Sequence, residues 1–332
     1  MGALKFAFGA NYKRFYNNIK DIAKNEDKST FSMFCDAVFC AIALGSGLSD
    51  YLNYEFYKKP FKEKKEYATI RNQDNFYAIV SPAEFKKTFT VKPTFMKVFS
   101  DYTKRKFLLP SESSVEELSS FLKANPCFIE KPLDGLGGYG VAKKYAKDIE
   151  SPESYFSYLL NNRLFIEELI IQHEKMSALC EKSVNTIRIM TSSTSGVPKI
   201  FFAGLRVGNG SRDVDNFHSG GMGILVDEET GVLIGQGIDK DLNHFSCHPV
   251  TKVKFDGYQL PFWDEIKKMV LEASLIEPRI MVIGWDVAIT PDGPVFVEAN
   301  RRPGFDMPQV LYKRGRKDLI TAALSELKAR NK

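Results

Sequence analysis

The sequence predicts a mixed α+β fold, in which hairpin-forming strands combine with amphipathic helices. Three observations predict it. Residues 284–303 read as a β-hairpin, residues 185–192 and 200–207 alternate as strands, and residues 31–48, 264–274 and 321–331 read as helices. The chain has 332 residues, which is enough for two domains with sizeable cores.

The composition indicates a soluble globular protein with no strong charge bias. Hydrophobic residues make up 44% and charged residues 26% of the chain. The net charge of +5 suits anionic ligands such as nucleotides, but no concentrated basic arm indicates nucleic-acid binding.

Cysteine and histidine usage excludes several kinds of site. Five scattered cysteines form neither a zinc-binding spacing nor a disulfide framework, and four histidines are too few for a His-rich metal site. The N-terminus lacks the pattern of a signal peptide, and the most apolar run is too short and interrupted to span a bilayer. We therefore expect a cytoplasmic protein without a transmembrane segment.

The first 75 residues predict a mainly helical region. Phe31, Phe34, Val38 and Ile42 share one helical face, which predicts a buried helix that ends near glycines 45 and 47. A helix at a membrane surface is the alternative. Residues 58–66 form a charged run that we expect to be an exposed bridge.

The next segment predicts one strand and two helices. Residues 76–80 form a short apolar run typical of a strand, and a helix is expected after Pro93, with Lys92 just before it. A second helix over 113–123 begins with Ser114 and has Glu117 three residues later, which is a capping box.

Residues 127–144 predict a strand, a glycine-rich loop over 134–140, and a second strand. This order differs from the strand, loop and helix of a dinucleotide-binding fold, and no Walker A sequence follows the loop. Such a loop can cover phosphates with its N–H groups, and Lys131 at its edge can add a positive charge. A hairpin without a ligand is the alternative.

Charged residues interrupt several strand-like runs. Glu167 and Glu168 lie in the apolar run 164–171. We expect this run to be a strand whose backbone holds a nucleotide base, and an exposed helical turn is the alternative. Arg188 and Arg206 lie at the centres of predicted strands, where arginines more often bind anions than stabilise a core. A second glycine turn follows in 213–227; it contains Asn216 and His218, and a purely structural histidine is the alternative there.

The hairpin over 284–303 predicts a metal site. With residues 291–293 as a three-residue loop, Thr290 faces Pro294 and Asp286 faces Glu298. Asn300 lies two residues further along and shares the face of Glu298. Two facing carboxylates repel unless a cation lies between them, and oxygen ligands suit Mg²⁺ or Mn²⁺. A solvated hairpin edge is the alternative.

Taken together, these pieces resemble the ATP-grasp superfamily, and within it the sugar-transfer-associated ATP-grasp proteins encoded with polysaccharide biosynthesis genes. The resemblance covers nearly the whole chain, including a Gly-x-x-x-x-Asp-Tyr element over 45–51. It rests on the runs KPLDGLGGYGV, EELIIQH, SVNTIRIMT, LRVG, DNFHSGGMG and GWDVAITPDGPVFVEANRRPG. It implies two α+β subdomains that grip ATP (81–165 and 166–332) behind a helical N-terminal region (1–80).

The resemblance also implies roles for individual residues. Lys92 and Lys131 would contact the phosphates, and Asp286, Glu298 and Asn300 would bind Mg²⁺. Nucleotide binding would further involve the flap loop, the adenine hinge and a ribose-binding acid: Gly135, Gly137, Gly138, Gly140, Glu167, Glu168, Ile170 and Glu174. A likeness to ribosomal-protein glutamate ligases would place four residues at the γ-phosphate and the acceptor: Arg188, Arg206, Asn216 and His218. D-alanine ligases have an arginine where this chain has Gly284, so Arg188 or Arg206 would replace it.

The activity implied is an ATP-dependent carboxylate–amine ligase that forms an acylphosphate and releases ADP. Its cofactors would be ATP and two Mg²⁺ ions, with Mn²⁺ as an alternative. The carboxylate would be a sugar acid or an amino acid in a surface polysaccharide, the second substrate an amine, and glycosyltransferases of the same pathway possible partners. A sugar kinase and a nucleotide-binding regulator of a glycosyltransferase are the alternatives.

Overall fold

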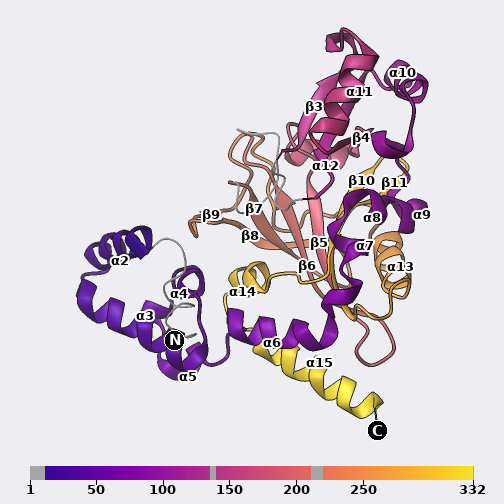
Figure 1. Cartoon of the computed structure of the whole chain (residues 1–332). Coiled ribbons are helices and arrows are strands. Elements are labelled where there is room, and N and C mark those ends of the chain that lie inside the picture. Colours follow the sequence, from indigo (N-terminus) through magenta and orange to yellow (C-terminus); the bar gives the residue numbers. More distant parts are fainter. Residues whose placement is uncertain (1–11, 135–139, 211–219, 332) are drawn as a thin grey trace. The chain divides into compact units, whose positions relative to one another are not determined.

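The computed structural model describes residues 12–134, 140–210 and 220–331 (Figure 1). The chain divides into two compact units. The first comprises Met1–Val80, Thr194–Val197 and Gly304–Lys332, and the second comprises Ser81–Ser193 and Pro198–Pro303. Among the described helices, none has both the length and the apolar character needed to cross a membrane.

The first unit is helical, as the sequence predicts. Its elements are α2 (Tyr12–Asn25), α3 (Thr30–Leu44), α4 (Leu48–Asn53), the 3₁₀ helix η1 (Phe56–Lys58), α5 (Phe61–Lys64), α6 (Ile70–Val80), α14 (Asp306–Leu311) and α15 (Lys317–Arg330). Helix α3 begins after Ser29, whose side chain accepts from the N–H of Ser32, and ends at Gly45 in the left-handed conformation.

Two details of this unit differ from the sequence-based expectation. The buried face of α3 is formed by Met33, Ala37, Cys40 and Ala41, whereas Phe31 and Ile42 are 77% and 58% exposed. Residues 76–80 belong to α6 and are not a strand. Phe76, Tyr77 and Val80 pack inward from this helix, because helical spacing places them on one face.

The charged run 58–66 is also less exposed than expected. Lys64 is 5% exposed, and its Nζ lies 2.6 Å from Oδ2 of Asp36. The hydroxyl of Tyr51 donates to the same carboxylate at 2.9 Å. A buried ammonium requires such a partner, so Lys64 joins α5 to α3.

The second unit contains an antiparallel four-stranded sheet in the order β1 (Phe107–Leu108), β4 (Leu164–Glu168), β2 (Cys127–Pro132) and β3 (Ala142–Tyr145). Helices α10 (Val115–Ala124) and α11 (Pro152–Asn161) share a core with it that includes Leu118, Phe128 and Leu159. The predicted capping box is confirmed, since Ser114 and Glu117 exchange hydrogen bonds at the start of α10. The 3₁₀ helices η3 (Pro110–Glu112) and η4 (Ala146–Asp148) belong to the same region.

A seven-stranded antiparallel sheet forms the rest of this unit. Its order is β11 (Gly293–Asn300), β10 (Val282–Thr290), β5 (Thr186–Ser192), β6 (Lys199–Val207), β7 (Met222–Val226), β8 (Leu233–Asp239) and β9 (His244–Phe245). The remaining helices are η2 (Ala83–Phe85), α7 (Lys87–Thr90), α8 (Lys92–Val98), α9 (Ser100–Thr103), α12 (Glu174–Leu179) and α13 (Trp263–Ala273). The core of this sheet includes Phe99, Trp285 and Phe296, and the rings of Trp285 and Phe296 stack at 4.5 Å.

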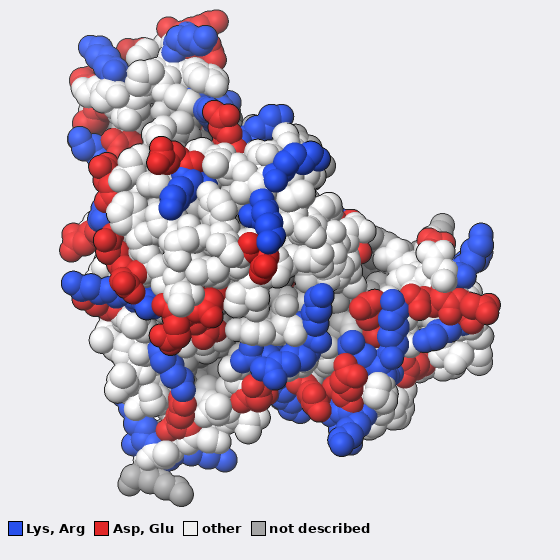
Figure 2. Space-filling view, turned by 180° about the vertical axis from the view of Figure 1, so that it is seen from behind, with Lys and Arg blue, Asp and Glu red and all other residues white. Residues whose placement is uncertain are grey.

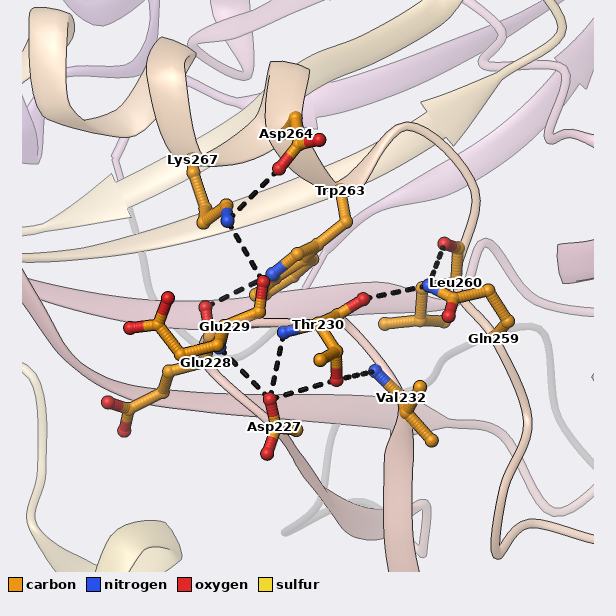
Figure 3. Close-up of polar contacts among 10 residues, drawn as sticks. All are labelled: Asp227, Glu228, Glu229, Thr230, Val232, Gln259, Leu260, Trp263, Asp264 and Lys267. Carbon is orange, nitrogen blue, oxygen red and sulfur yellow. Dashed lines mark hydrogen bonds and ion pairs between the residues drawn. The ribbon is translucent and has the colours of Figure 1, made fainter.

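The turn between β7 and β8 anchors α13 to the sheet (Figure 3). Oδ1 of Asp227 accepts from the N–H groups of Glu229 and Thr230, at 3.1 and 2.8 Å. The indole Nε1 of Trp263 donates to the carbonyl of Glu228 at 3.1 Å. Gly231 has φ +74°, and a Cβ there would lie 2.6 Å from Cδ2 of Trp263, so this position requires glycine.

Basic and acidic side chains are interspersed on the face that Figure 2 shows. On that face Lys and Arg alternate with Asp and Glu around uncharged areas. This distribution is consistent with the mild net charge of the sequence.

Candidate active site

The β10–β11 hairpin places Asp286 directly opposite Glu298, as the sequence predicts. The turn is different: Thr290 pairs with Gly293, so the loop has two residues instead of three. A register shift between the pairs Val287–Phe296 and Asp286–Glu298 compensates, because β11 has one extra residue, Val297, at that point. Gly293, directly after the loop residues Pro291 and Asp292, has φ +111°, a value that favours glycine.

Two arginines surround the carboxylate of Asp286, which is fully buried. Arg188 lies opposite Asp286 on β5, and its Nε is 2.5 Å from Oδ1. Its Nη2 donates to Oδ2 at 3.0 Å, and Nη2 of Arg206 on β6 donates to the same oxygen at 2.9 Å. Both arginines therefore contact an anion at this site, and in this structure that anion is Asp286.

The two facing carboxyls have pKa values shifted in opposite directions. Burial alone would raise the pKa of Asp286, but Arg188 and Arg206 outweigh it and hold this pKa below its usual range. Burial and the charge of Asp286 raise the pKa of Glu298. Glu298 is therefore the member of the pair that takes up a proton more readily.

Gly284 is the position at which the resemblance to D-alanine ligases would place an arginine. A Cβ on Gly284 would lie 2.6 Å from Cβ of Pro303 and 3.3 Å from Nη1 of Arg188. The guanidinium of Arg188 thus lies beside the space that a side chain at position 284 would enter.

A pocket of about 180 Å³ in the second unit brings together residues that are far apart in the sequence. Lys92 is the first residue of α8, Lys131 lies on β2, and Glu298 and Asn300 lie on β11. The rest of the lining is largely apolar: Phe89, Thr90, Phe95, Met96, Asp134, Phe165, Glu167, Val297 and Ala299. Positive and oxygen-bearing groups thus meet within one mostly apolar cavity.

Glu167 is held away from solvent by two cations. Its carboxylate is 2% exposed and accepts a short hydrogen bond from Nζ of Lys131, and Nη2 of Arg105 lies 3.6 Å from its Oε2. Burial alone would raise the pKa of Glu167, but Lys131 and Arg105 lower it. Arg105 was not among the predicted residues, and nothing in the local sequence distinguishes it from the lysines beside it.

Lys92 lines the pocket and is half-buried. Burial lowers the pKa of its ammonium, and Glu298 partly opposes that effect. Its backbone N–H donates to the carbonyl of Leu133 at 3.1 Å, which ties the start of α8 to the end of β2. A half-buried ammonium at the edge of such a pocket suits an anionic ligand.

Other predicted residues lie elsewhere. Oε2 of Glu168 accepts from the N–H of Lys106 at 2.9 Å, Ile170 is half-buried, and Glu174 is exposed at the start of α12; none of the three lines the pocket. Gly140 has φ +75° at the end of the glycine-rich loop. The remaining five residues lie outside the described part of the chain: Gly135, Gly137, Gly138, Asn216 and His218.

The donor set at the hairpin fits Mg²⁺. It consists of two carboxylates and one amide, all oxygen donors, and Mg²⁺ completes its shell with water and substrate phosphates. Oδ1 of Asp286 is buried without a hydrogen-bond partner of good geometry, despite its close approach to Arg188. Within the described ranges, no group of three or more His, Cys, Asp or Glu side chains could hold a metal ion.

A model of the sugar-transfer-associated ATP-grasp family matches residues 51–323. The chain belongs to this family. No curated protein sequence matches it. The ATP-grasp family assignment agrees with the two antiparallel sheets and the helical N-terminal region of the structure.

Several solved structures are similar to parts of the chain at low sequence identity. The ATP-grasp ligase PsnB, complexed with a minimal precursor, Mg and ADP, is 15% identical with a TM-score of 0.42; the match covers 75% of this chain and 62% of PsnB. D-cycloserine synthetase DcsG is 10% identical with a TM-score of 0.45, over 84% of this chain and 82% of DcsG. The D-alanine–D-alanine ligase of Coxiella burnetii is 12% identical with a TM-score of 0.39, over 73% and 60%.

Proposed function

We propose that this ATP-grasp protein is an ATP-dependent carboxylate–amine ligase that forms an acylphosphate and releases ADP. The observation that carries the proposal is the pocket in which Lys92 and Lys131 face Glu298 and Asn300, with Asp286 directly opposite Glu298. Two cations beside an oxygen donor set suit a nucleotide triphosphate with Mg²⁺.

In this proposal, Lys131 and Lys92 bind the phosphates of ATP. The segment 167–170 binds adenine through its backbone, Glu174 binds the ribose, and the loop that ends at Gly140 covers the phosphates. The apolar side chains of the pocket, among them Phe95 and Phe165, exclude water from the phosphate chain. Water exclusion strengthens each charge–charge contact in the site.

Asp286, Glu298 and Asn300 would hold Mg²⁺, which shields the negative charge of the phosphates. Arg188 and Arg206 place two guanidinium groups on the carboxylate opposite Glu298. At that place they can stabilise charge on the transferring phosphoryl group, and Asn216 and His218 would face the acceptor.

The reaction needs no protein nucleophile. A carboxylate oxygen of the first substrate attacks the γ-phosphorus of ATP, and the bond from this phosphorus to the bridging oxygen breaks, so that ADP leaves. The amine of the second substrate then attacks the acyl carbon, the carbon–oxygen bond to phosphate breaks, and an amide and inorganic phosphate form. The nitrogen loses its extra proton to solvent. Positioning and electrostatics supply the catalysis.

The substrates we propose are a sugar acid, or an amino acid, and an amine in surface polysaccharide synthesis, with glycosyltransferases of the pathway as partners. A panel of uronic acids and amino acids tests this, with ADP release measured with and without amines. Hydroxylamine, which converts acylphosphates to hydroxamates, identifies the intermediate. We expect hydroxamate formation that requires both ATP and a carboxylate. ADP release with a neutral sugar alone would instead indicate a kinase, and no turnover with any acceptor would indicate a regulatory protein.

A further inference from the structure

Arg105 lies between α9 and β1, outside every motif of the sequence, and its side chain is only 5% exposed. Its guanidinium contacts several parts of the second unit, and its Nη2 donates to Sδ of Met96 on α8 at 3.7 Å. Nη1 donates to the carbonyl of Phe296 on β11 at 2.7 Å and to that of Thr103 at 3.3 Å. Nη2 lies 3.6 Å from Oε2 of Glu167 on β4. Arg105 therefore connects the four-stranded sheet to the edge strand of the seven-stranded sheet.

The surroundings of Arg105 are not those that maximise stability. A buried guanidinium is costly unless its donors are satisfied, and Nε of Arg105 has no hydrogen-bond partner among the described residues. Replacing buried ion pairs by apolar side chains is often neutral or stabilising. The charge at this place is thus better explained by what it positions.

The first group that Arg105 positions is Lys131. Oε1 of Glu167 accepts a hydrogen bond from Lys131, and Oε2 forms an ion pair with Arg105. The three side chains together have a net charge of +1. Without Arg105, Glu167 would neutralise Lys131 completely. Lys131 faces the pocket, so this positive charge adds to that of Lys92 in attracting an anion.

The second group is the backbone of β11 at its bulge. Phe296 is the last residue in regular register with β10, Val297 is the extra residue, and Glu298 follows opposite Asp286. A slip of one residue moves a side chain to the other face of a sheet. The hydrogen bond from Arg105 to the Phe296 carbonyl fixes the backbone where Glu298 is brought into line with Asp286.

We propose that Arg105 is a positioning residue that couples the phosphate-binding lysine to the metal-binding hairpin, by holding Glu167 with one nitrogen and the bulge at Phe296 with the other. The inference rests on the proposed function, which assigns the phosphates to Lys131 and Mg²⁺ to Asp286 and Glu298.

The test compares Arg105→Met with Arg105→Lys in the full chain. Calorimetry measures the affinity for ADP with Mg²⁺, and electron paramagnetic resonance measures Mn²⁺ binding without nucleotide. We expect Arg105→Met to weaken ADP binding by roughly tenfold or more, the range of a hydrogen bond to a charged group, and to weaken Mn²⁺ binding as well. Arg105→Lys keeps the charge but lacks the planar fork. It should recover most of the ADP affinity while Mn²⁺ binding stays weakened.

A double-mutant cycle with Glu167→Gln separates the two roles. If Arg105 acts on Lys131 through Glu167, the effect of Arg105→Met on ADP affinity disappears in the Glu167→Gln background, whereas its effect on Mn²⁺ binding persists. Additive effects on ADP affinity would overturn the Glu167 route. Arg316→Met is the matched control: Arg316 is buried, is paired with Asp318 and stacks on Tyr312 in the first unit. It should lower stability and leave both affinities unchanged.

Two results are decisive against the inference. If Arg105→Met binds both ADP and Mn²⁺ with wild-type affinity, the positioning role is overturned. If the Met variant does not fold, the same result in Arg105→Lys overturns it. An equal loss of both affinities in Arg316→Met would show that lowered stability is the cause. A wild-type protein that binds neither ADP nor Mn²⁺ contradicts the proposed function itself, and this outcome is distinct from the other two.

Discussion

Asp286 on β10 lies directly opposite Glu298 on β11 because one extra residue, Val297, bulges from β11 just before Glu298. In a regular ladder after the same two-residue turn, Glu298 would pair with Trp285 and its side chain would lie on the other face of the sheet. Arg188 flanks Asp286 from the neighbouring strand β5. Asp286 therefore lies between a cation on one strand and an acid on the other.

This arrangement predicts different effects for two similar substitutions. Glu298→Gln removes a carboxyl whose pKa is raised by burial and by Asp286, so the free energy of unfolding should stay the same or increase. Asp286→Asn leaves Arg188 and Arg206 without their counter-charge, and breaking such a buried pair costs about 3–5 kcal/mol. Both variants should lose Mn²⁺ binding and turnover. Urea unfolding with Mn²⁺ titration checks this, and normal activity of both variants at saturating Mg²⁺ would exclude the metal site.

Asp50 predicts a pH dependence of stability that is independent of the pocket. It is buried, accepts the N–H groups of Gly47 and Ile70 on Oδ2, and burial raises its pKa to about 6, with a further contribution from Asp306. The folded state thus binds a proton more tightly than the unfolded state. The stabilisation is complete below the unfolded pKa and is lost as the pH rises through about 6.

Between pH 5 and pH 7.5 the loss from Asp50 should be about 1 kcal/mol. Urea unfolding of the wild type and of Asp50→Asn over this range measures it. The Asn variant should show a flatter profile, since its amide does not titrate. A profile with the same slope in both proteins would assign the pH dependence to other groups.

Much of the candidate site was predictable because its signals are local. The β-branched alternation of the hairpin places Asp286 opposite Glu298, and strand periodicity places Arg188 and Arg206 on strands. The expectation that both lie at strand centres was wrong for Arg206, which is the second-last residue of β6. The turn prediction was wrong by one residue, and the bulge at Val297 cancelled that error. Sequence periodicity alone does not distinguish a longer loop from a shorter loop with a bulge, because both give the same offset.

The features that sequence did not predict depend on tertiary contacts. Arg105 and Lys64 lie in charged runs typical of solvated surface, yet each is buried against a carboxylate from a distant segment. Residues 76–80 have the apolar character of a strand, but they continue a helix that begins at Ile70. The sequence likewise does not predict which way a side chain points. The side chain of Glu167 points toward Lys131 and Arg105, and its position in an apolar run does not indicate this.

Gly140 allows a test of how the glycine-rich loop returns to β3. It has φ +75°, and a Cβ there would lie 3.3 Å from Cγ of Pro132. Gly140→Val should displace the end of the loop, because a β-branched residue is strongly disfavoured at positive φ. We expect weaker ADP binding and less amide product per ADP formed. Gly257→Val is the control, since Gly257 has φ +84° with nothing within 4 Å of a Cβ. If Gly257→Val weakens ADP binding as much as Gly140→Val does, backbone strain alone explains the loss of affinity.

Lys131 provides the sharpest test of the nucleotide site. Lys131→Met removes the ammonium that pairs with Glu167 and faces the pocket, so ADP binding should weaken by about 10- to 150-fold, as charge-assisted contacts contribute roughly 1.5–3 kcal/mol. The substitution also leaves Glu167 with only Arg105 as a cation, which should raise the pKa of Glu167 and lower stability. Lys144→Met on the neighbouring strand β3 is the control, since Lys144 is half-exposed, lies outside the pocket, and has its Nζ 3.9 Å from Oε1 of Glu130.

Adding Glu167→Gln to Lys131→Met tests whether the loss of ADP affinity follows the loss of stability. Glu167→Gln removes the counter-charge of the buried Arg105 guanidinium, so the double variant should not regain the lost stability. It cannot restore a cation for the phosphates, so ADP binding should stay weak. Calorimetry and urea unfolding of the wild type, both single variants and the double variant measure the two quantities independently. Recovery of ADP affinity together with stability would mean that Lys131 supports the fold and that the phosphates bind elsewhere.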